Sequence, residues 1–227
     1  DRAGAEVARA TSIVRYAPGS GYSSHRHDGG EEILVLDGVF SDEHGDYPAG
    51  TYLRNPPGTS HQPFSKDGCT LLVKLWQFAA DDAEQVVINT KAQSWRQGLV
   101  PGLSVMPLHE HNGVNTALVR WAPNTRFNRH IHVGGEEIFV LQGLFRDEHG
   151  EYPAGSWLRS PRWSRHAPHT GREGARHHHI EGQGFTARQV EEAGPRPRLA
   201  QAGEHRRGDV GDMHRLPQPA RRGRQRQ

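Results

Sequence analysis

The sequence contains an internal repeat with an offset of 105 residues. The segment "TSIVRYAPGS" at Thr11 matches "TALVRWAPNT" at Thr116, and "DEHGDYPAGTYLRNPPGTSH", ending at His61, matches "DEHGEYPAGSWLRSPRWSRH", ending at His166. Self-similarity over this length indicates that one structural unit has been duplicated. Any fold for this chain therefore uses the same architecture twice.

The repeated unit has the pattern of a β-protein. Its apolar segments "SIVRY", "EEILVL" and "TYLRN" are short, rich in β-branched, Leu and aromatic residues, and bounded by Gly, Pro, Asp and Asn. No stretch of the repeat sustains a helical period. Strands spaced about ten residues apart are typical of barrels and sandwiches. The sequence therefore predicts an all-β fold with two barrels or sandwiches in tandem.

The first repeat carries a set of metal-ligating side chains. His25 and His27 are two residues apart, so both imidazoles face the same side of an extended strand. A Gly-Gly turn returns the chain to Glu31, with the adjacent Glu32 as the alternative, and His61 follows thirty residues later. Three imidazoles and one carboxylate suit a divalent transition metal, zinc first, with Fe(II), Mn(II), Ni(II) and Cu(II) also compatible.

The second repeat has the same residue types at the same positions, namely His130, His132, Glu136 and His166. His-x-His alone is a weak signal, because two polar residues also occur on any solvated strand face. Repetition of the full set is a much more specific signal. The sequence therefore predicts a metal site in each repeat.

Two segments of the first repeat resemble the two cupin motifs. Gly19-x5-His25-x-His27-x3-Glu31-x6-Gly38 resembles the first motif, and Gly50-x5-Pro56-x-Gly58-x2-His61 resembles the second. The surrounding "GGEEILVLDGVFSDEHGDYPAGTYLRNPPGTSH" is similar to the ChrR-type cupin branch, named for the C-terminal domain of a zinc-binding anti-sigma factor. The match runs in tandem over residues 11–174.

The resemblance implies a bicupin, that is, two double-stranded β-helix (jelly-roll) barrels with a metal in each. It assigns the ligands as His25, His27, Glu31 and His61 in the first site and His130, His132, Glu136 and His166 in the second. Glu31 is preferred to Glu32 because it keeps the x6-Gly spacing and has the strand parity of Ile33. The second repeat departs from the motifs at Asn124 and Trp163, which replace glycines in turns where we expect positive φ.

The repeat boundaries predict a first barrel over residues 1–90, a second over 91–174 and a tail over 175–227. The first repeat ends on the strand-like "TLLVKLWQF", whereas the second continues as "APHTGREGARHHHIEGQGF". We therefore expect the second barrel to lack its closing strand. The tail, which includes His177, His178 and His179, has 11 Arg and no Lys, and we expect it to be disordered. Its abrupt departure from the repeat suggests a shifted reading frame near residue 175.

Charge and apolar content narrow the classes of protein. Residues 1–174 carry 17 Lys plus Arg against 20 Asp plus Glu, whereas nucleic-acid-binding domains show clustered basic surface. No apolar run approaches the roughly 20 residues of a membrane span. Cys69 is the single cysteine, which excludes an internal disulfide and favours a reducing compartment. We expect a cytoplasmic protein, and a homodimer because an incomplete barrel exposes strand edges.

Two functions share such a site. The ChrR resemblance implies a regulatory or sensing module, although this sequence lacks the His-x3-Cys-x2-Cys zinc module of the anti-sigma factor. Cupins similar to this branch also include metal-dependent dioxygenases that cleave diketones or hydroxyketones, which implies Fe(II) and a small-molecule substrate. A metal-stabilised barrel without catalysis is the third alternative. The sequence identifies no catalytic residue.

Overall fold

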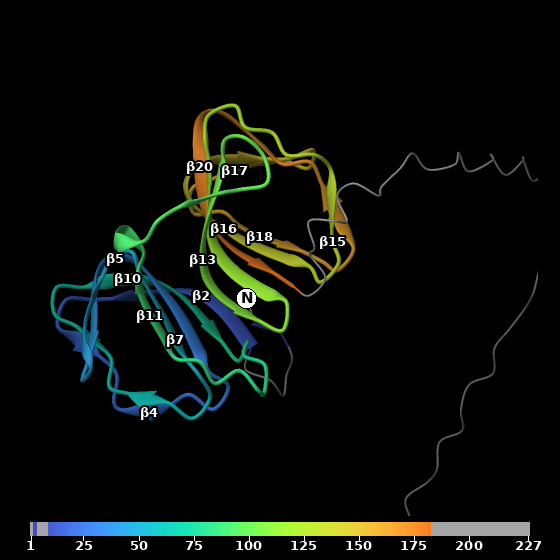
Figure 1. The fold of residues 1–227 in the computed structure, drawn as a ribbon. Coiled ribbons are helices and arrows are strands. Elements are labelled where there is room, and N and C mark those ends of the chain that lie inside the picture. The colour runs from blue at the N-terminus through green and yellow to red at the C-terminus, as the bar shows by residue number, and fades with distance from the viewer. Residues whose placement is uncertain (1, 4–8, 183–227) are drawn as a thin grey trace, which may run out of the picture. The chain divides into compact units, whose positions relative to one another are not determined.

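The computed structural model describes residues 2–3 and 9–182 (Figure 1). Both repeats lie in one compact unit. The disorder expected for the tail falls on residues 183–227, outside the described residues, and stays a prediction. In the described part of the chain no helix is long and apolar enough to cross a membrane.

Strands make up both repeats, and the described residues contain no α-helix, which confirms the all-β prediction. The strands of the first repeat are β1 (Arg2–Ala3), β2 (Arg9–Tyr16), β3 (Ser20–Gly21), β4 (His25–Arg26), β5 (Glu31–Asp42), β6 (Gly45–Pro48), β7 (Thr51–Asn55), β8 (Ser60–His61), β9 (Phe64–Ser65), β10 (Cys69–Leu75) and β11 (Val86–Asn89). After the 3-10 turn η1 (Thr90–Ala92), the second repeat has β12 (Arg96–Gln97), β13 (Leu103–His111), β14 (Val114–Trp121), β15 (His130–His132), β16 (Glu136–Arg146), β17 (Glu151–Pro153), β18 (Trp157–Ser160), β19 (Ser164–His166) and β20 (His169–Glu181).

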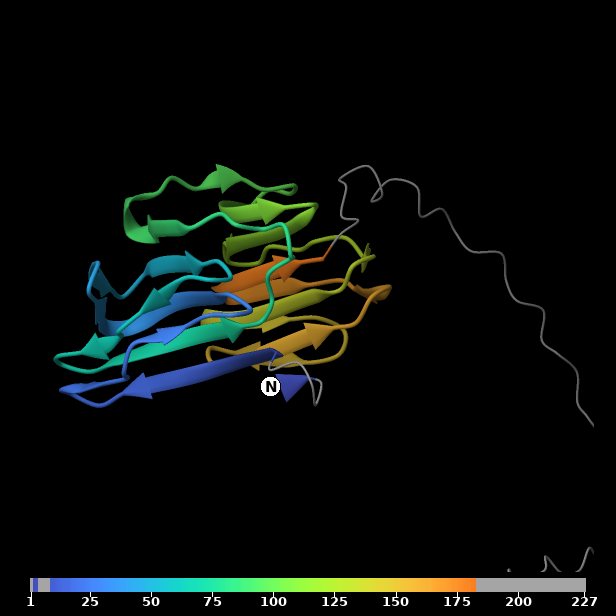
Figure 2. The ribbon, with the colours of Figure 1, turned by 90° about the horizontal axis from the view of Figure 1, so that it is seen from below.

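The two repeats share one topology. The first has the sheet order β1-β2-β10-β5-β7-β11, and the second has β12-β13-β14-β20-β16-β17 with β18 paired to β16. A short ladder faces each large sheet, β4-β8 in the first repeat and β15-β19 in the second (Figures 1 and 2). Neither large sheet closes on itself among the described residues, so each barrel is an open jelly roll.

The second barrel has a closing strand, contrary to the sequence prediction. Strand β20 pairs with β14 on one side and with β16 on the other, as β10 pairs with β2 and β5 in the first repeat. It continues to Glu181, so residues 175–181 belong to a strand and not to a disordered tail. The physical reason is that a ladder is held by backbone groups, and β14 and β16 present an unpaired edge each to whatever chain follows His166.

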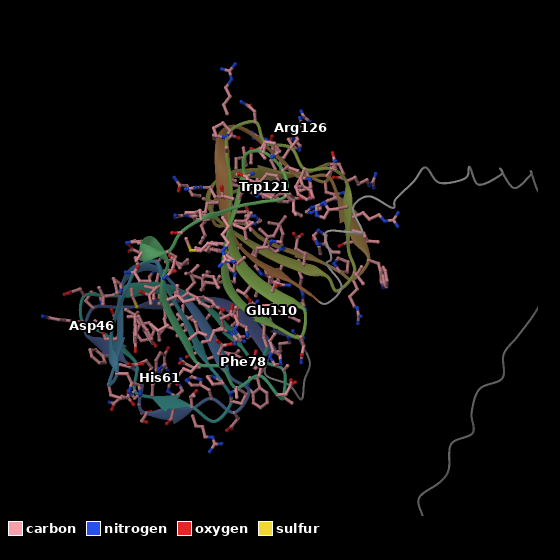
Figure 3. All side chains as sticks on the ribbon, in the orientation of Figure 1. Asp46, His61, Phe78, Glu110, Trp121 and Arg126 are labelled. Atoms are coloured by element: carbon pink, nitrogen blue, oxygen red, sulfur yellow. The ribbon has the colours of Figure 1, made fainter. Side chains whose placement is uncertain are left out.

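Residues 31–35 of β5 are buried on both faces of the sheet, which explains the continuous apolar run there. Ile33 and Val35 point into the first barrel, where they pack with Phe40 and Leu71. Leu34 faces the other way, toward the second repeat. The second barrel has a matching interior cluster around Trp121 (labelled in Figure 3), Ile138 and Phe145.

A third apolar cluster joins the two repeats. It combines Leu34, Tyr52 and Leu72 of the first with Met106, Leu108, Leu118 and Phe139 of the second. Charged residues lie among these side chains: Lys74 forms a short ion pair with Glu137, and His178 Nε2 lies 3.6 Å from Glu32 Oε1. The large sheets of the two repeats therefore pack against each other, and the short β4-β8 and β15-β19 ladders lie on the outer sides.

Asn124 and Trp163 have φ of 57° and 67°, and the glycines that they replace, Gly19 and Gly58, have φ of 73° and 95°. The prediction that these turns need a left-handed backbone is thus confirmed. The second repeat keeps the turn geometry with residues that adopt it at a cost.

Candidate metal centres

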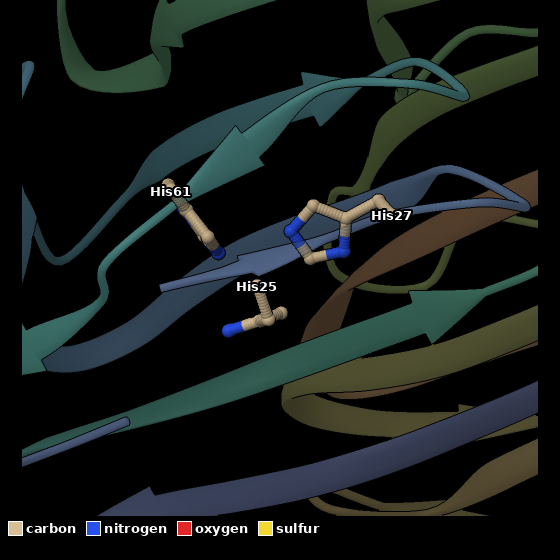
Figure 4. Close-up of side chains that lie close together, drawn as sticks. All are labelled: His25, His27 and His61. Atoms are coloured by element: carbon tan, nitrogen blue, oxygen red, sulfur yellow. The ribbon is translucent and has the colours of Figure 1, made fainter. Parts of the chain in front are cut away.

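Three histidines of the first repeat come together at the short β4-β8 ladder. His25 pairs directly with His61 across this ladder, and His27 follows two residues after His25. The ring centroids lie 4.7 to 5.1 Å apart, and the ligand atoms all lie within 4.8 Å of one another (Figure 4). The pairing of β4 with β8 is therefore what joins a His-x-His pair to a histidine more than thirty residues away.

Glu31 approaches the same point from the opposite sheet. As the first residue of β5, it places Oε2 3.4 Å from His27 Nε2 and 3.5 Å from His61 Nε2. Asn55, its partner on β7, donates from Nδ2 to this oxygen at 3.3 Å. Glu32 points to the other face of the strand, where Oε2 lies 3.7 Å from Arg54 Nε.

The second repeat reproduces this arrangement. His130 pairs with His166 in the β15-β19 ladder, and His132 Nε2 lies 3.0 Å from His166 Nε2. Glu136 Oε2 lies 3.5 Å from His132 Nε2 and 3.7 Å from His166 Nε2. The structure therefore brings together in each repeat the residues that the sequence selected.

The outer nitrogens of these rings have partners of their own. His25 Nδ1 faces the carbonyl oxygen of Ser23 at 2.9 Å, and His61 Nδ1 faces Asp42 Oδ2 at 3.2 Å. An acceptor at Nδ1 places the ring proton there and leaves the Nε2 lone pair directed inward. In the second repeat, His130 Nδ1 faces the Asn128 carbonyl at 3.0 Å, and His166 Nδ1 faces Asp147 Oδ2 at 3.2 Å.

Asp42 and Asp147 contact the two candidate sites, and the sequence reasoning missed them. In each case Oδ2 faces the last histidine of the site, while Oδ1 accepts hydrogen bonds from a backbone N–H two residues on and from a Tyr hydroxyl at 3.1 Å, Tyr47 or Tyr152. The signal was present, since the turn "DEHG" and the later Tyr recur in register. Burial alone would raise the pKa of Asp147, but hydrogen bonds from the His149 N–H, His166 and Tyr152 lower it.

The site fits a divalent cation by its polar atoms. His27 Nε2, His61 Nε2 and Glu136 Oε2 are buried without a hydrogen-bond partner, which is costly unless something else binds them. Two ligands held about 2.1 Å from one metal are about 3.0 Å apart in octahedral geometry and about 3.4 Å apart in tetrahedral geometry. The nitrogen–oxygen and nitrogen–nitrogen distances of 3.0 to 3.7 Å come close to these values.

The protonation states suit the same cation near neutral pH. Burial, and then the neighbouring His61 and His25, lower the pKa of His27 to about 4. Burial raises the pKa of Glu31 to about 7, against the opposing hydrogen bond from Asn55. His27 is therefore neutral with a lone pair to offer, and Glu31 loses its proton readily to a positive ion.

A cavity lies beside the last histidine of each site. In the first repeat it measures about 320 Å³ and is lined by His27 and His61, by Tyr47 and Asn55, and by Leu53 and Val87. Its counterpart in the second repeat measures about 370 Å³ and is lined by His166, Tyr152, Arg159 and Arg165. Each cavity has the volume of a small organic molecule.

Two jelly-roll barrels in tandem, each with His-x-His, Glu and a distant His between its sheets, define the chain as a cupin with two barrels. It belongs to the ChrR cupin-like domain family, whose model matches residues 2–79 and 83–184. The resemblance seen in the sequence is thus confirmed. No curated protein sequence matched the chain.

Several solved structures share the fold. A candidate dioxygenase from Nostoc punctiforme matches with a TM-score of 0.71 at 16% identity, over 83% of this chain and 74% of that chain. A salicylate 1,2-dioxygenase from Pseudaminobacter salicylatoxidans gives 0.59 at 11% identity, over 76% and 70%. A point mutant of oxalate decarboxylase from Bacillus subtilis gives 0.55 at 15% identity, over 80% and 71%.

Proposed function

We propose that each barrel binds one divalent transition metal and that the chain is a regulatory or sensing module, in which a small molecule enters the cavity beside the metal. The ligands are His25, His27, Glu31 and His61 in the first centre and His130, His132, Glu136 and His166 in the second. The observation that carries this proposal is the convergence of inward-facing Nε2 atoms whose rings are held at Nδ1 by Asp42 and Asp147. Zinc is the first choice of metal, with Fe, Mn and Ni as alternatives.

The bound metal would supply Lewis acidity toward an oxygen of the small molecule. The protein residues would do the rest. Asp42 orients His61, Asn55 holds the Glu31 carboxylate, and Leu53 and Val87 give the cavity an apolar wall. Tyr47 keeps its proton, since burial and Asp42 raise its pKa to about 12, and its hydroxyl donates to Asp42.

A second candidate function is a metal-dependent dioxygenase that cleaves diketone-like or hydroxyketone substrates. The observation that favours it is the cavity reaching His27 and His61, since an enzyme needs a coordination position open to substrate. The structures that share the fold include a mutant salicylate 1,2-dioxygenase in complex with gentisate and a mutant oxalate decarboxylase. This candidate requires iron.

We also propose a homodimer in the cytoplasm. The argument from an incomplete barrel no longer applies, because β20 fills the edge. The support for a dimer is now that large apolar side chains are exposed to solvent, among them Ile13, Val87 and Trp163. Size-exclusion chromatography with light scattering gives the mass, and a monomer at micromolar concentration contradicts the dimer. The support for a cytoplasmic location is the free thiol of the buried Cys69, which favours a reducing compartment.

The metal content of tag-free protein, purified without chelators, tests the central proposal. We expect close to two equivalents per chain by mass spectrometry, about one in His61→Ala and in His166→Ala, and none in the double variant. His111→Ala, which removes a histidine bonded to Asp81, is the matched control and should keep both. Iron with oxygen uptake on adding a diketone supports the dioxygenase, and zinc supports the sensing module. Fully folded protein without metal after incubation with each cation contradicts both functions.

A further inference from the structure

Two of the three consecutive histidines in β20 face the interior of the second barrel. His179 pairs with Ile138 in the ladder with β16, and the equivalent residue of the first repeat, Val73, pairs with Ile33. By the same register, His177 takes the position of Leu71. The second repeat therefore has imidazoles where the first has aliphatic core side chains.

His179 reaches the carboxylate of the second candidate metal centre. Its Nε2 lies 3.3 Å from Glu136 Oε1, whereas the other carboxylate oxygen, Oε2, faces His132 and His166. The Glu136 side chain is only 4% exposed, so its Oε1 depends on donors from the protein. Oε1 of Glu136 thus faces His179, and Oε2 faces two imidazoles of the candidate metal centre.

The first centre holds its carboxylate in another way. There Asn55 donates to Glu31, and the two residues are direct partners in the β5-β7 ladder. The matching partner of Glu136 in the β16-β18 ladder is Ser160, whose side chain is shorter. The second repeat has lost the amide donor of the first and has gained an imidazole from the opposite neighbour strand.

The neighbours of His179 fix its orientation. Trp121 donates from Nε1 to His177 Nε2 at 3.1 Å, which holds the His177 ring. The rings of His177 and His179 stack with centroids 5.6 Å apart and an interplanar angle of 16°. Phe145 also stacks with His177, with ring centroids 5.1 Å apart. His179 is therefore the last ring of a supported stack, and its edge meets Glu136.

We propose that His179 is a positioning residue of the second metal centre. Its Nε2–H donates to Glu136 Oε1 and holds Oε2 toward His132 and His166. This inference depends on the proposed metal binding at that centre. It makes the two centres unequal, because the carboxylate of the first is held by an amide from β7 and that of the second by an imidazole from β20.

The test measures Co(II) affinity at the second centre alone, in a parent chain whose first centre is disabled by His61→Ala. We expect His179→Val, which introduces the residue of the first repeat, to weaken Co(II) binding about 10- to 100-fold, as is usual for partners that orient a ligand. Adding Ser160→Asn restores an amide donor and should recover most of the affinity. His178→Leu, on the same strand but facing Glu32 of the other repeat, is the matched control and should leave the affinity unchanged.

The d–d absorption of bound Co(II) separates the outcomes. Weaker binding in His179→Val with recovery in the double variant supports the positioning role. Affinity within twofold of the parent overturns it, and loss without recovery by Ser160→Asn also overturns it, because His179 would then be a direct ligand. A folded parent that binds no Co(II) shows instead that the second centre itself is wrong. Circular dichroism checks the fold, and His179→Ala replaces the valine variant should that variant unfold.

Discussion

Lys74 of β10 and Glu137 of β16 form an ion pair between the two repeats, and the Lys74 side chain is only 2% exposed. Lys74 Nζ also donates to the Thr11 hydroxyl at 3.1 Å. The residue of the second repeat that matches Lys74 in its ladder is Ile180. The positive charge of Lys74 is thus present in the first repeat only, and Glu137 of the second repeat is its negatively charged partner.

Removing the lysine should destabilise the contact between repeats. We expect Lys74→Ile to lower the free energy of unfolding by about 1–3 kcal/mol, because Glu137 then loses its charged partner while it stays partly buried. The double variant Lys74→Ile, Glu137→Met should recover most of this loss. Urea unfolding of the four proteins of this cycle gives the coupling energy. A coupling energy near zero would show that the Lys74–Glu137 ion pair does not stabilise the contact between the repeats.

Replacing Asp42 should weaken the first metal centre without unfolding the barrel. In Asp42→Asn the remaining oxygen accepts from the His44 N–H and the Tyr47 hydroxyl, so the NH2 group faces His61 Nδ1, which needs an acceptor. We therefore expect metal affinity to fall about 10- to 100-fold. The matched control is Asp46→Asn in the same turn, since Asp46 accepts a hydrogen bond from the Ser41 hydroxyl. Isothermal titration with Zn²⁺ in the His166→Ala background measures this affinity. Equal affinities for the two variants contradict the role of Asp42.

The buried His178 should make the chain sensitive to acid. Burial, and then Lys74 and His179, lower its pKa from 6.5 to about 3. A histidine with a lowered pKa contributes stability that is present above pH 6.5 and is lost as the pH falls toward 3. At pH 4.5 this loss amounts to about 2–3 kcal/mol.

His178→Leu introduces the residue that the first repeat has at this position, Leu72, and should remove that part of the pH dependence. Urea unfolding at pH 7 and pH 4.5, with a chelator present so that metal loss does not contribute, measures the change. Glu32 faces His178 and has a pKa raised by burial, so Glu32→Gln serves as the comparison. The same pH dependence in wild type and His178→Leu would show that His178 is not the acid-sensitive group.

The turn at Trp163 should be stabilised by the glycine that the first repeat has there. Trp163 has φ of 67° and is 63% exposed, so Trp163→Gly relieves the backbone and gives up little burial. We expect a gain of about 1 kcal/mol in the free energy of unfolding. Gly58→Ala should show a loss of similar size from the φ of 95° alone, since an added Cβ meets only the end of Arg26, at 3.5 Å, which is an ordinary contact. Thermal unfolding of both variants tests the pair, and a destabilised Trp163→Gly contradicts the argument.

The sequence by itself determined the duplication, the all-β class, and the identity and order of the histidines and glutamates. It could do so because each of these is a pattern of residue types along the chain. His25 and His27 share a strand face, and the lost glycines lie in turns whose φ is a local property. The same reasoning missed Asp42: its turn recurs in register, but its contact with His61 depends on the pairing of distant strands.

The tertiary structure alone decided what the segment after His166 does. A polar segment that reads as a tail becomes β20, since backbone groups of β14 and β16 accept any chain that can extend between them. That placement turns His177 inward to Trp121, His178 toward the first repeat and His179 onto Glu136. A side-chain pattern predicts a strand where apolar residues alternate. Here the backbone hydrogen bonds of the ladder fix the strand instead, and histidines become buried in it.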